Sequence, residues 1–260
     1  MMLYFQGGYN DLLHRWISIQ AMSIHAFCLV FRESTLGDGV EDCVLNGMTF
    51  FTREKLRERE LLLESISQVR GAVVEAGVAL GGTAIFVTAL AQGRRPVHLY
   101  DVFGLIPPPS DAKDTPDAKK RYKIIAAGKS RGFGNQTYYG YQKDLLSQVQ
   151  QNFKTCKVPT ACVNFHKGLV ENTMMNINFD VAYLHCDTDF YSAVYHCLVD
   201  GSPHVVIGGV IVIDDYYAYG PARNAVTDFF KEINSTHLKT SRNHVFRVTK
   251  TSVLSLTRLE

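Results

Sequence analysis

After residue 70, short apolar runs alternate with segments of helical length, and this alternation constrains the fold more than any other feature. Buried parallel strands read as such runs because helices cover both faces of their sheet. The five runs lie at 72–76, 97–100, 162–165, 181–186 and 210–213, and the helical segments at 83–92, 142–153, 190–199 and 222–233. Two further runs, 244–248 and 253–256, are close enough to form an antiparallel hairpin. The pattern predicts an α/β fold with a doubly wound sheet of seven strands and an antiparallel edge.

The N-terminal part of the chain is expected to be an addition to this core. Residues 1–7 end in Leu-Tyr-Phe-Gln-Gly and resemble the remnant of a protease-cleavable expression tag, so they are set aside. Residues 8–54 are predicted to be a helical and loop addition, and 55–260 the main domain. The apolar segment 12–31 is interrupted by His14, Arg15 and His25, which disfavours a membrane span and favours a packed helix. That helix suits the contact of a homo-oligomer.

Two segments break the simple pattern. The helix expected after Thr52 is rich in Glu, Arg and Lys, and we interpret these charges as a solvated face. Residues 105–140 contain four prolines, namely Pro107, Pro108, Pro109 and Pro116. The same segment contains a Gly-rich stretch at 128–140. A connection this long within a compact domain is typically functional, so we expect a lid over a binding site.

Charge and cysteine content exclude some classes of protein. The chain has 27 Lys and Arg against 25 Asp and Glu, and this near balance disfavours nucleic acid as its main partner. Its six cysteines form no C-x-x-C pair, which disfavours a zinc ribbon. We expect free thiols in a reducing compartment, and therefore a soluble, cytoplasmic protein that does not bind membranes.

A glycine-rich turn follows the first predicted strand. It reads Glu75-Ala-Gly77-Val-Ala-Leu-Gly81-Gly, and Asp101 ends the second strand. Glycines allow a tight turn and a close backbone approach, and an acidic strand end suits the hydroxyls of a ribose. The spacing of Gly77 and Gly81 departs from the dinucleotide fingerprint, which disfavours a nicotinamide dehydrogenase. The turn predicts a nucleotide-like cofactor, with ordinary strand-end turn chemistry as the alternative.

Carboxylates follow the fourth and fifth predicted strands. Asp187 and Asp189 end one strand, and Asp214 and Asp215 end the next. Because parallel strands place their carboxyl ends at one edge, these side chains are expected to converge, and a divalent cation would remove their repulsion. Oxygen ligands favour Mg²⁺ or Ca²⁺ over zinc. The alternative is that these residues only cap helices and form turns.

The motifs together resemble those of the macrocin O-methyltransferase family over residues 48–233. The matching pieces are VVEAGVALGGT, LYDVFGLIPP, FHKGLVENT, YLHCDTDFY and GGVIVIDDYYAYGPARNAVTDF. This resemblance implies a Rossmann-like methyltransferase sheet and an enzyme that uses S-adenosylmethionine and Mg²⁺ to methylate sugar hydroxyls of natural products. It implies cofactor-binding roles for Glu75, Gly77, Gly81, Asp101 (on the ribose) and Phe103 (beside the adenosine), and metal-binding roles for Asp187, Asp214 and Asp215.

The chemistry of methyl transfer agrees with these residues. An acceptor hydroxyl must be aligned with the methyl donor and lose its proton, and the Asp187 carboxylate is the predicted proton acceptor. The sequence therefore predicts an O-methyltransferase with a small hydroxyl-bearing acceptor, a sugar being favoured. Two alternatives stay open: a catechol-type enzyme, and a cofactor-binding protein without turnover.

Overall fold

The computed structural model describes residues 39–232, 238–242 and 246–250, all of which belong to one compact unit, Asp38–Glu260. The tag-like residues 1–7, the apolar segment 12–31 and the predicted run 253–256 lie outside the described residues. The homo-oligomer expected from segment 12–31 therefore stays a prediction. The expected boundary between residues 54 and 55 falls inside the helix α3, Arg53–Ser65. Among the described helices, none has the length and apolar content that crossing a membrane requires.

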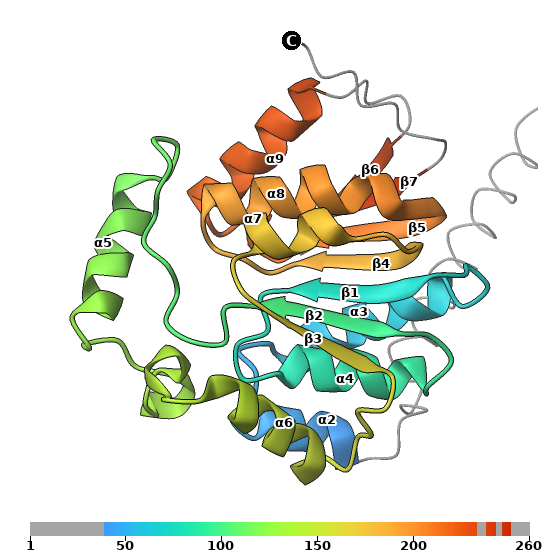
Figure 1. The fold of residues 1–260 in the computed structure, drawn as a ribbon, viewed down its shortest axis with the longest axis horizontal. Helices are drawn as coiled ribbons and strands as arrows, with labels where there is room; N and C mark the ends of the chain where they lie inside the picture. The colour runs from blue at the N-terminus through green and yellow to red at the C-terminus, as the bar shows by residue number, and fades with distance from the viewer. Residues whose placement is uncertain (1–38, 233–237, 243–245, 251–260) are drawn as a thin grey trace, which may run out of the picture. The chain divides into compact units, whose positions relative to one another are not determined.

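A single twisted sheet forms the centre of the fold (Figure 1). Its strand order is β3-β2-β1-β4-β5-β7-β6. The five parallel strands are β1 Ala72–Ala76, β2 Val97–Asp101, β3 Val163–Lys167, β4 Val181–Cys186 and β5 Val205–Ile213. The predicted parallel α/β sheet is confirmed. The chain reverses its direction of strand addition between β1 and β4, which is where open α/β sheets bind their ligands.

Of the two antiparallel strands, one overlaps the predicted run 244–248 and the other precedes it in the sequence. They are β6 Leu238–Arg242 and β7 Phe246–Lys250, and β7 pairs with β5. The predicted hairpin of 244–248 with 253–256 was therefore wrong in its pairing. The sequence of β6 is Leu-Lys-Thr-Ser-Arg, which contains no apolar run for a pattern search to detect.

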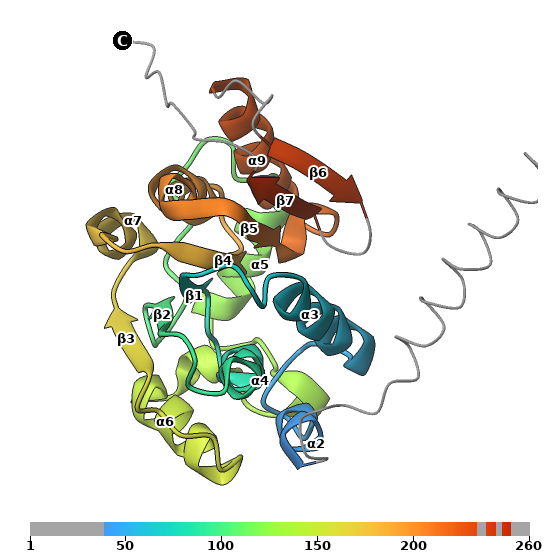
Figure 2. The same cartoon turned by 90° about the vertical axis from the view of Figure 1, so that its right-hand side faces the viewer.

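Helices cover both faces of the sheet. α3 and α4, Gly82–Ala91, lie on one side, while α7, Val170–Thr173, and α8, Tyr191–Gly201, lie on the other (Figure 2). All six residues of β4 are buried, as expected for a strand covered on both faces. Alternate strand residues such as Leu184 and Ile211 pack with Leu198 of α8 and Phe229 of α9, Gly220–Glu232. This packing holds the carboxyl ends of β1, β4 and β5 in fixed positions.

The segment predicted to be a lid is partly helical. It contains α5, Pro116–Ala126, and short 3-10 turns at Phe133–Asn135 and Tyr139–Tyr141, before α6, Leu145–Thr155. The start of α5 has Thr115 as its N-cap and Pro116 in its first turn, a position that proline favours. The Asp114 carboxylate accepts a hydrogen bond from the backbone N–H of Tyr191, which ties the segment to α8.

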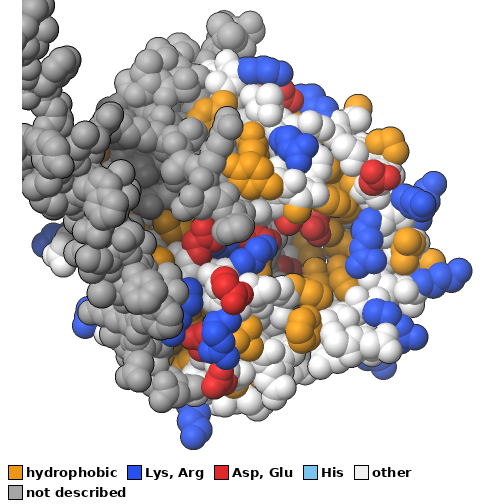
Figure 3. All heavy atoms as spheres, turned by 180° about the vertical axis from the view of Figure 1, so that it is seen from behind, with side chains coloured by type: hydrophobic (Ala, Val, Ile, Leu, Met, Phe, Trp, Pro, Cys, Tyr) orange, Lys and Arg blue, Asp and Glu red, His pale blue; other side chains and the backbone are white. Residues whose placement is uncertain are grey.

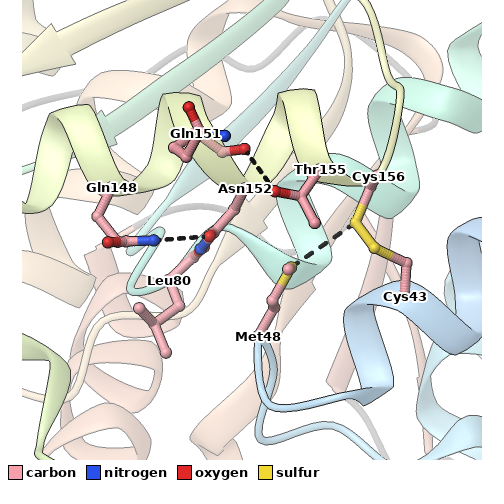
Figure 4. The surroundings of a disulfide bond; sticks show 8 residues. All are labelled: Cys43, Met48, Leu80, Gln148, Gln151, Asn152, Thr155 and Cys156. Carbon is pink, nitrogen blue, oxygen red and sulfur yellow. Dashed lines mark hydrogen bonds between the residues drawn. A yellow bond between two sulfur atoms is a disulfide. The ribbon is translucent and has the colours of Figure 1, made fainter.

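Two disulfides overturn the expectation of free thiols for four cysteines, whereas Cys162 is free as expected. Cys43 of α2, Gly39–Leu45, is bonded to Cys156 at the end of α6, and Cys186 of β4 is bonded to Cys197 of α8. Figure 4 shows that the first of these bonds joins α2 to α6 beside Met48. The Sδ of Met48 lies 3.6 Å from the Sγ of Cys156. Sequence spacing did not reveal the Cys43–Cys156 pair, because tertiary packing brings together residues 113 positions apart. The Cys186–Cys197 pair, 11 positions apart, forms no C-x-x-C motif.

Loss of the Cys43–Cys156 bond is expected to destabilise the protein strongly. A cross-link that closes so long a loop restricts the unfolded chain, and Cys156→Ser should lower the free energy of unfolding by about 4 kcal/mol. Urea unfolding without reductant measures the change. Cys162→Ser is the matched control because Cys162 is a free cysteine. Equal stability of Cys156→Ser and Cys162→Ser would contradict the prediction.

Candidate active site

Two cavities meet at the carboxyl edge of the parallel strands. The first has a volume of about 280 Å³ and the second about 350 Å³. The residues that line both come from the ends of β1, β2 and β4 and from the segment after β2, namely Gly77, Asp101, Ile106, Tyr139, Asp187, Asp189 and Phe190. From behind, acidic and apolar side chains are seen together around a hollow in the surface (Figure 3). The two cavities therefore form one continuous candidate site.

The glycine-rich turn has the close backbone approach that its sequence predicts. Gly77 has φ +89°, and a Cβ atom at this position would lie 1.9 Å from the backbone oxygen of Asp187. Gly81 has φ +85° and is the N-cap of α4. A Cβ at Gly82 would lie 2.4 Å from the backbone oxygen of Met48. The turn is thus enclosed by β4 on one side and by residues 48–49 on the other.

Replacing Gly77 with Ala is expected to abolish cofactor binding. The new methyl group meets backbone of β4 that is fixed by the sheet, and the left-handed φ adds strain. Calorimetry with S-adenosylhomocysteine measures the loss, and circular dichroism reports whether the sheet survives. Gly93→Ala is the control, since Gly93 also has a positive φ but open space around its Cβ position. Wild-type affinity in Gly77→Ala would contradict the role of the turn.

Asp101 holds the turn in place. Its Oδ2 accepts hydrogen bonds from the backbone N–H groups of Val78 and Ala79, at 2.7 and 3.2 Å, and its Oδ1 accepts one from Phe103. Burial raises the pKa of Asp101, and the three amides partly offset that effect. The residue lines both cavities. It therefore shapes the turn as well as facing the place predicted for a ribose.

The family resemblance implies that Phe103 lies beside the adenosine, and this role stays a prediction. Its side chain is buried against Phe165, with ring centroids 6.1 Å apart, and it lines neither cavity. Its backbone φ of +46° turns the chain after Asp101, and Val102 faces the first cavity instead. The direction of a side chain after a strand end depends on this local turn, which the motif alone did not show.

Three predicted metal-binding carboxylates come together at this edge. One carboxylate oxygen from each of Asp187, Asp214 and Asp215 lies within 4.8 Å of the others. Burial, followed by repulsion from Asp214 and Asp215, raises the pKa of Asp187 well above its ordinary value. Burial and neighbouring carboxylates also raise the pKa of Asp215 to about 7. The fold has thus placed like charges together, as the strand-end pattern predicts.

Asp189 and Glu75 add to the negative charge of the site. Burial is the main cause that raises the pKa of Asp189 to about 6, and it lines both cavities without belonging to the three-carboxylate cluster. Glu75 lines the second cavity, and burial raises its pKa to about 8. Its Oε1 lies 3.8 Å from Nδ1 of His185, whose pKa burial holds well below the usual range.

Two cations of α3 reach this acidic cluster, and the interpretation of the charged helix as a solvated face was wrong for them. The side chain of Arg59 has no exposed surface, and its Nη2 lies 2.5 Å from Oδ1 of Asp214. The Nζ of Lys55 lies 3.0 Å from Oδ2 of the same carboxylate. A sequence signal existed, because Arg59 lies in the apolar stripe between Leu56 and Leu63.

Aromatic side chains form much of the second cavity. Those that line it come from the segment before α3, the segment after α5, the residue before α8 and the turn after β5, namely Phe50, Phe51, Tyr138, Tyr139, Phe190 and Tyr219. The ring of Phe50 packs edge-on against that of Tyr139, with centroids 6.2 Å apart. Arg121 of α5 also lines this cavity. The arrangement offers flat apolar walls and two cations, Arg121 and Lys55, beside the carboxylates.

The comparison with protein families decides the identity. Residues 30–245 match the family described as macrocin O-methyltransferase (TylF). The chain belongs to the macrocin O-methyltransferase family. It is accordingly an S-adenosylmethionine-dependent O-methyltransferase, and the prediction of an enzyme of this class is confirmed.

Curated relatives of this O-methyltransferase have natural-product names. It is 24% identical over 210 residues to demethyldecarbamoylnovobiocin O-methyltransferase of Streptomyces niveus, covering 76% of this chain and 73% of the relative. It is 29% identical over 224 residues to mycinamicin III 3''-O-methyltransferase of Micromonospora griseorubida, covering 80% and 82%.

Solved structures with the same fold include the O-methyltransferase NovP. That structure has 21% sequence identity and a TM-score of 0.67, covering 80% of this chain and 84% of its own. The S-adenosylhomocysteine-bound methyltransferase PaMTH1 of Podospora anserina has 11% identity and a TM-score of 0.52, covering 96% and 100%. Likeness at these identities supports the α/β methyltransferase fold.

Proposed function

We propose that this O-methyltransferase transfers a methyl group from S-adenosylmethionine to a sugar hydroxyl of a natural-product-like acceptor, with assistance from Mg²⁺. The single observation that carries the proposal is the convergence of Asp187, Asp214 and Asp215 beside the glycine turn. The names of the relatives support the acceptor class, because one is a 3''-O-methyltransferase and another acts at a rhamnosyl 4' position.

The residues present fit S-adenosylmethionine. The absence of a side chain at Gly77 lets the turn approach the backbone of Asp187, and Gly77 and Asp101 line both cavities. The first cavity has an apolar wall that includes Val102, Leu169 and Ala193, which suits an adenine ring. We assign the adenosine end to this cavity and the methionine end to the glycine turn, so that the methyl group faces the second cavity.

The carboxylate cluster fits a hard divalent cation. Burial, and after it the neighbouring carboxylates, raises the pKa values of Asp187 and Asp215, and Mg²⁺ would compensate those charges through oxygen ligands. Asp187, Asp214 and Asp215 would hold the ion. When bound, Mg²⁺ supplies Lewis-acid chemistry that orients an acceptor hydroxyl and eases its deprotonation.

Two carboxylates face the place where donor and acceptor meet. Asp187 and Asp189 each line both cavities. We keep Asp187 as the proton acceptor expected from the sequence, and Asp189 is a second candidate because it lies outside the cluster that would hold the ion. The main task of the other residues is alignment, since methyl transfer depends on bringing two reactants into line.

The second cavity suits a ring-bearing acceptor. Tyr138, Tyr139 and Tyr219 provide aromatic walls next to the carboxylates. Sugars and catechols both offer adjacent hydroxyls and a flat or partly apolar ring, so a catechol-type reaction is the second candidate. The relatives' names favour the sugar.

A screen of acceptors tests the proposal. Deoxysugar glycosides, catechols and simple phenols are incubated with S-adenosylmethionine, with Mg²⁺ or with EDTA, and methylated products are measured by mass spectrometry. We expect a glycoside to be methylated in the presence of Mg²⁺, and we expect EDTA to abolish this methylation. Transfer to catechols alone would replace the sugar assignment, and full activity in EDTA would overturn the role of the metal.

A further inference from the structure

The carboxylate of Asp214 is held by a different cation at each oxygen. Nη2 of Arg59 lies 2.5 Å from Oδ1, and Nζ of Lys55 lies 3.0 Å from Oδ2. Both cations come from the same face of α3, one helical turn apart. A carboxylate predicted to bind a metal is thus already paired at both oxygens.

The two cations differ in their freedom to move. Arg59 is enclosed, with no exposed side-chain surface, whereas the side chain of Lys55 is 37% exposed and lines the second cavity. Lysine has a flexible stem and a compact point charge, while the guanidinium of arginine holds a fixed planar geometry. The Arg59 side chain is therefore fixed against Asp214, whereas the Lys55 ammonium group is able to move away from it.

The ammonium group already has a second partner beside Asp214. Nζ of Lys55 is 4.7 Å from the centroid of the Phe51 ring, which also lines the cavity. An ammonium over an aromatic face gains a favourable electrostatic contact. Lys55 thus keeps a partner when it releases Oδ2 of Asp214.

We propose that Lys55 is a resident counter-cation of the metal site, a positioning residue that competes with the divalent ion for Asp214. Its ammonium neutralises Oδ2 before the ion binds and withdraws when the ion enters, while Arg59 keeps the carboxylate oriented. This inference rests on the metal site of the proposed function.

Repulsion between like charges favours this exchange. The Asp214 carboxylate that would hold a divalent ion also pairs with Nζ of Lys55, at 3.0 Å. An ion bound by that carboxylate would therefore lie close to the ammonium group and be repelled by it. Withdrawal of Lys55 lowers that repulsion, so the lysine limits how tightly the site holds its metal.

The test is the affinity for Mn²⁺ alone, measured by electron paramagnetic resonance of the free ion. Lys55→Met should bind Mn²⁺ about tenfold more tightly than wild type, since removing one charge a few ångströms from a divalent ion in a solvated cavity has an effect of this order. Lys231→Met is the matched control. Lys231 also lies 3.0 Å from an aspartate oxygen, that of Asp228, but on the exposed surface of α9. The Mn²⁺ affinity of Lys231→Met should equal that of the wild-type protein.

The outcomes separate the two proposals. Equal Mn²⁺ affinity in wild type, Lys55→Met and Lys231→Met overturns the role of Lys55 and leaves the metal site standing. Absence of Mn²⁺ binding in all three overturns the metal site itself. Weaker binding in Lys55→Met also overturns the inference, because it would make Lys55 a support of the site. If Lys55→Met does not fold, Lys55→Gln, which keeps a hydrogen-bond donor for Asp214, replaces it.

Discussion

Replacing Asp215 with Asn is expected to lower the rate of methyl transfer about a hundredfold, the order of effect that loss of one electrostatic contributor at a reacting centre has. The Asp215 carboxylate belongs to the three-carboxylate cluster and makes no ion pair with the described residues. Burial and the nearby Asp189 carboxylate already disfavour the negative charge of Asp215. The substitution removes this charge, so the free energy of unfolding should not fall. Steady-state kinetics with saturating Mg²⁺ measures the rate.

The same variant separates catalysis from cofactor binding. Asp215 does not line the first cavity, so the affinity for S-adenosylhomocysteine in calorimetry should remain close to that of wild type. Asp117→Asn, which changes an acidic residue in the first turn of α5, is the control for loss of negative charge. A wild-type rate in Asp215→Asn would contradict the assignment of the metal ligands.

Replacing Asp214 with Asn is expected to lower the free energy of unfolding by about 3–5 kcal/mol, because it leaves a buried guanidinium without its counter-charge. Arg59 has no exposed side-chain surface, and its Nε has no hydrogen-bond partner. The remaining carboxylate within reach, that of Glu58, is 3.4 Å away. Urea unfolding followed by circular dichroism measures the change.

A double variant shows whether the buried charge is the cause. Arg59→Met combined with Asp214→Asn removes the charge as well as its partner, and it should recover much of the lost stability. If Asp214→Asn alone is as stable as wild type, the Arg59 ion pair does not support the fold. The expected instability also makes Asp215→Asn the cleaner probe of the metal site.

Local patterns were enough to predict the central architecture. The apolar runs at 72–76, 97–100 and 181–186 correspond to β1, β2 and β4, because strands covered on both faces of a sheet are mostly apolar. The rule that ligands bind at carboxyl strand ends then placed Asp187 and the Asp214–Asp215 pair at one edge, where the structure brings them together.

Contacts between distant segments were beyond such patterns. Arg59 follows Leu56 on a helix of mostly charged residues, and only the packing of α3 turns it inward to Asp214, 155 positions away. The Cys43–Cys156 bond likewise depends on how α2 and α6 approach each other. Helical spacing places Arg59 on the apolar face of α3, but neither its partner nor the disulfide pairing follows from periodicity.

The sequence by itself thus determined which segments form the sheet and which carboxylates end its strands, because burial and strand alternation act over a few residues. The tertiary structure decided which charges neutralise those carboxylates and where Phe103 and the cysteines lie. These depend on the approach of elements far apart in the chain, and long-range packing rather than local preference sets that approach.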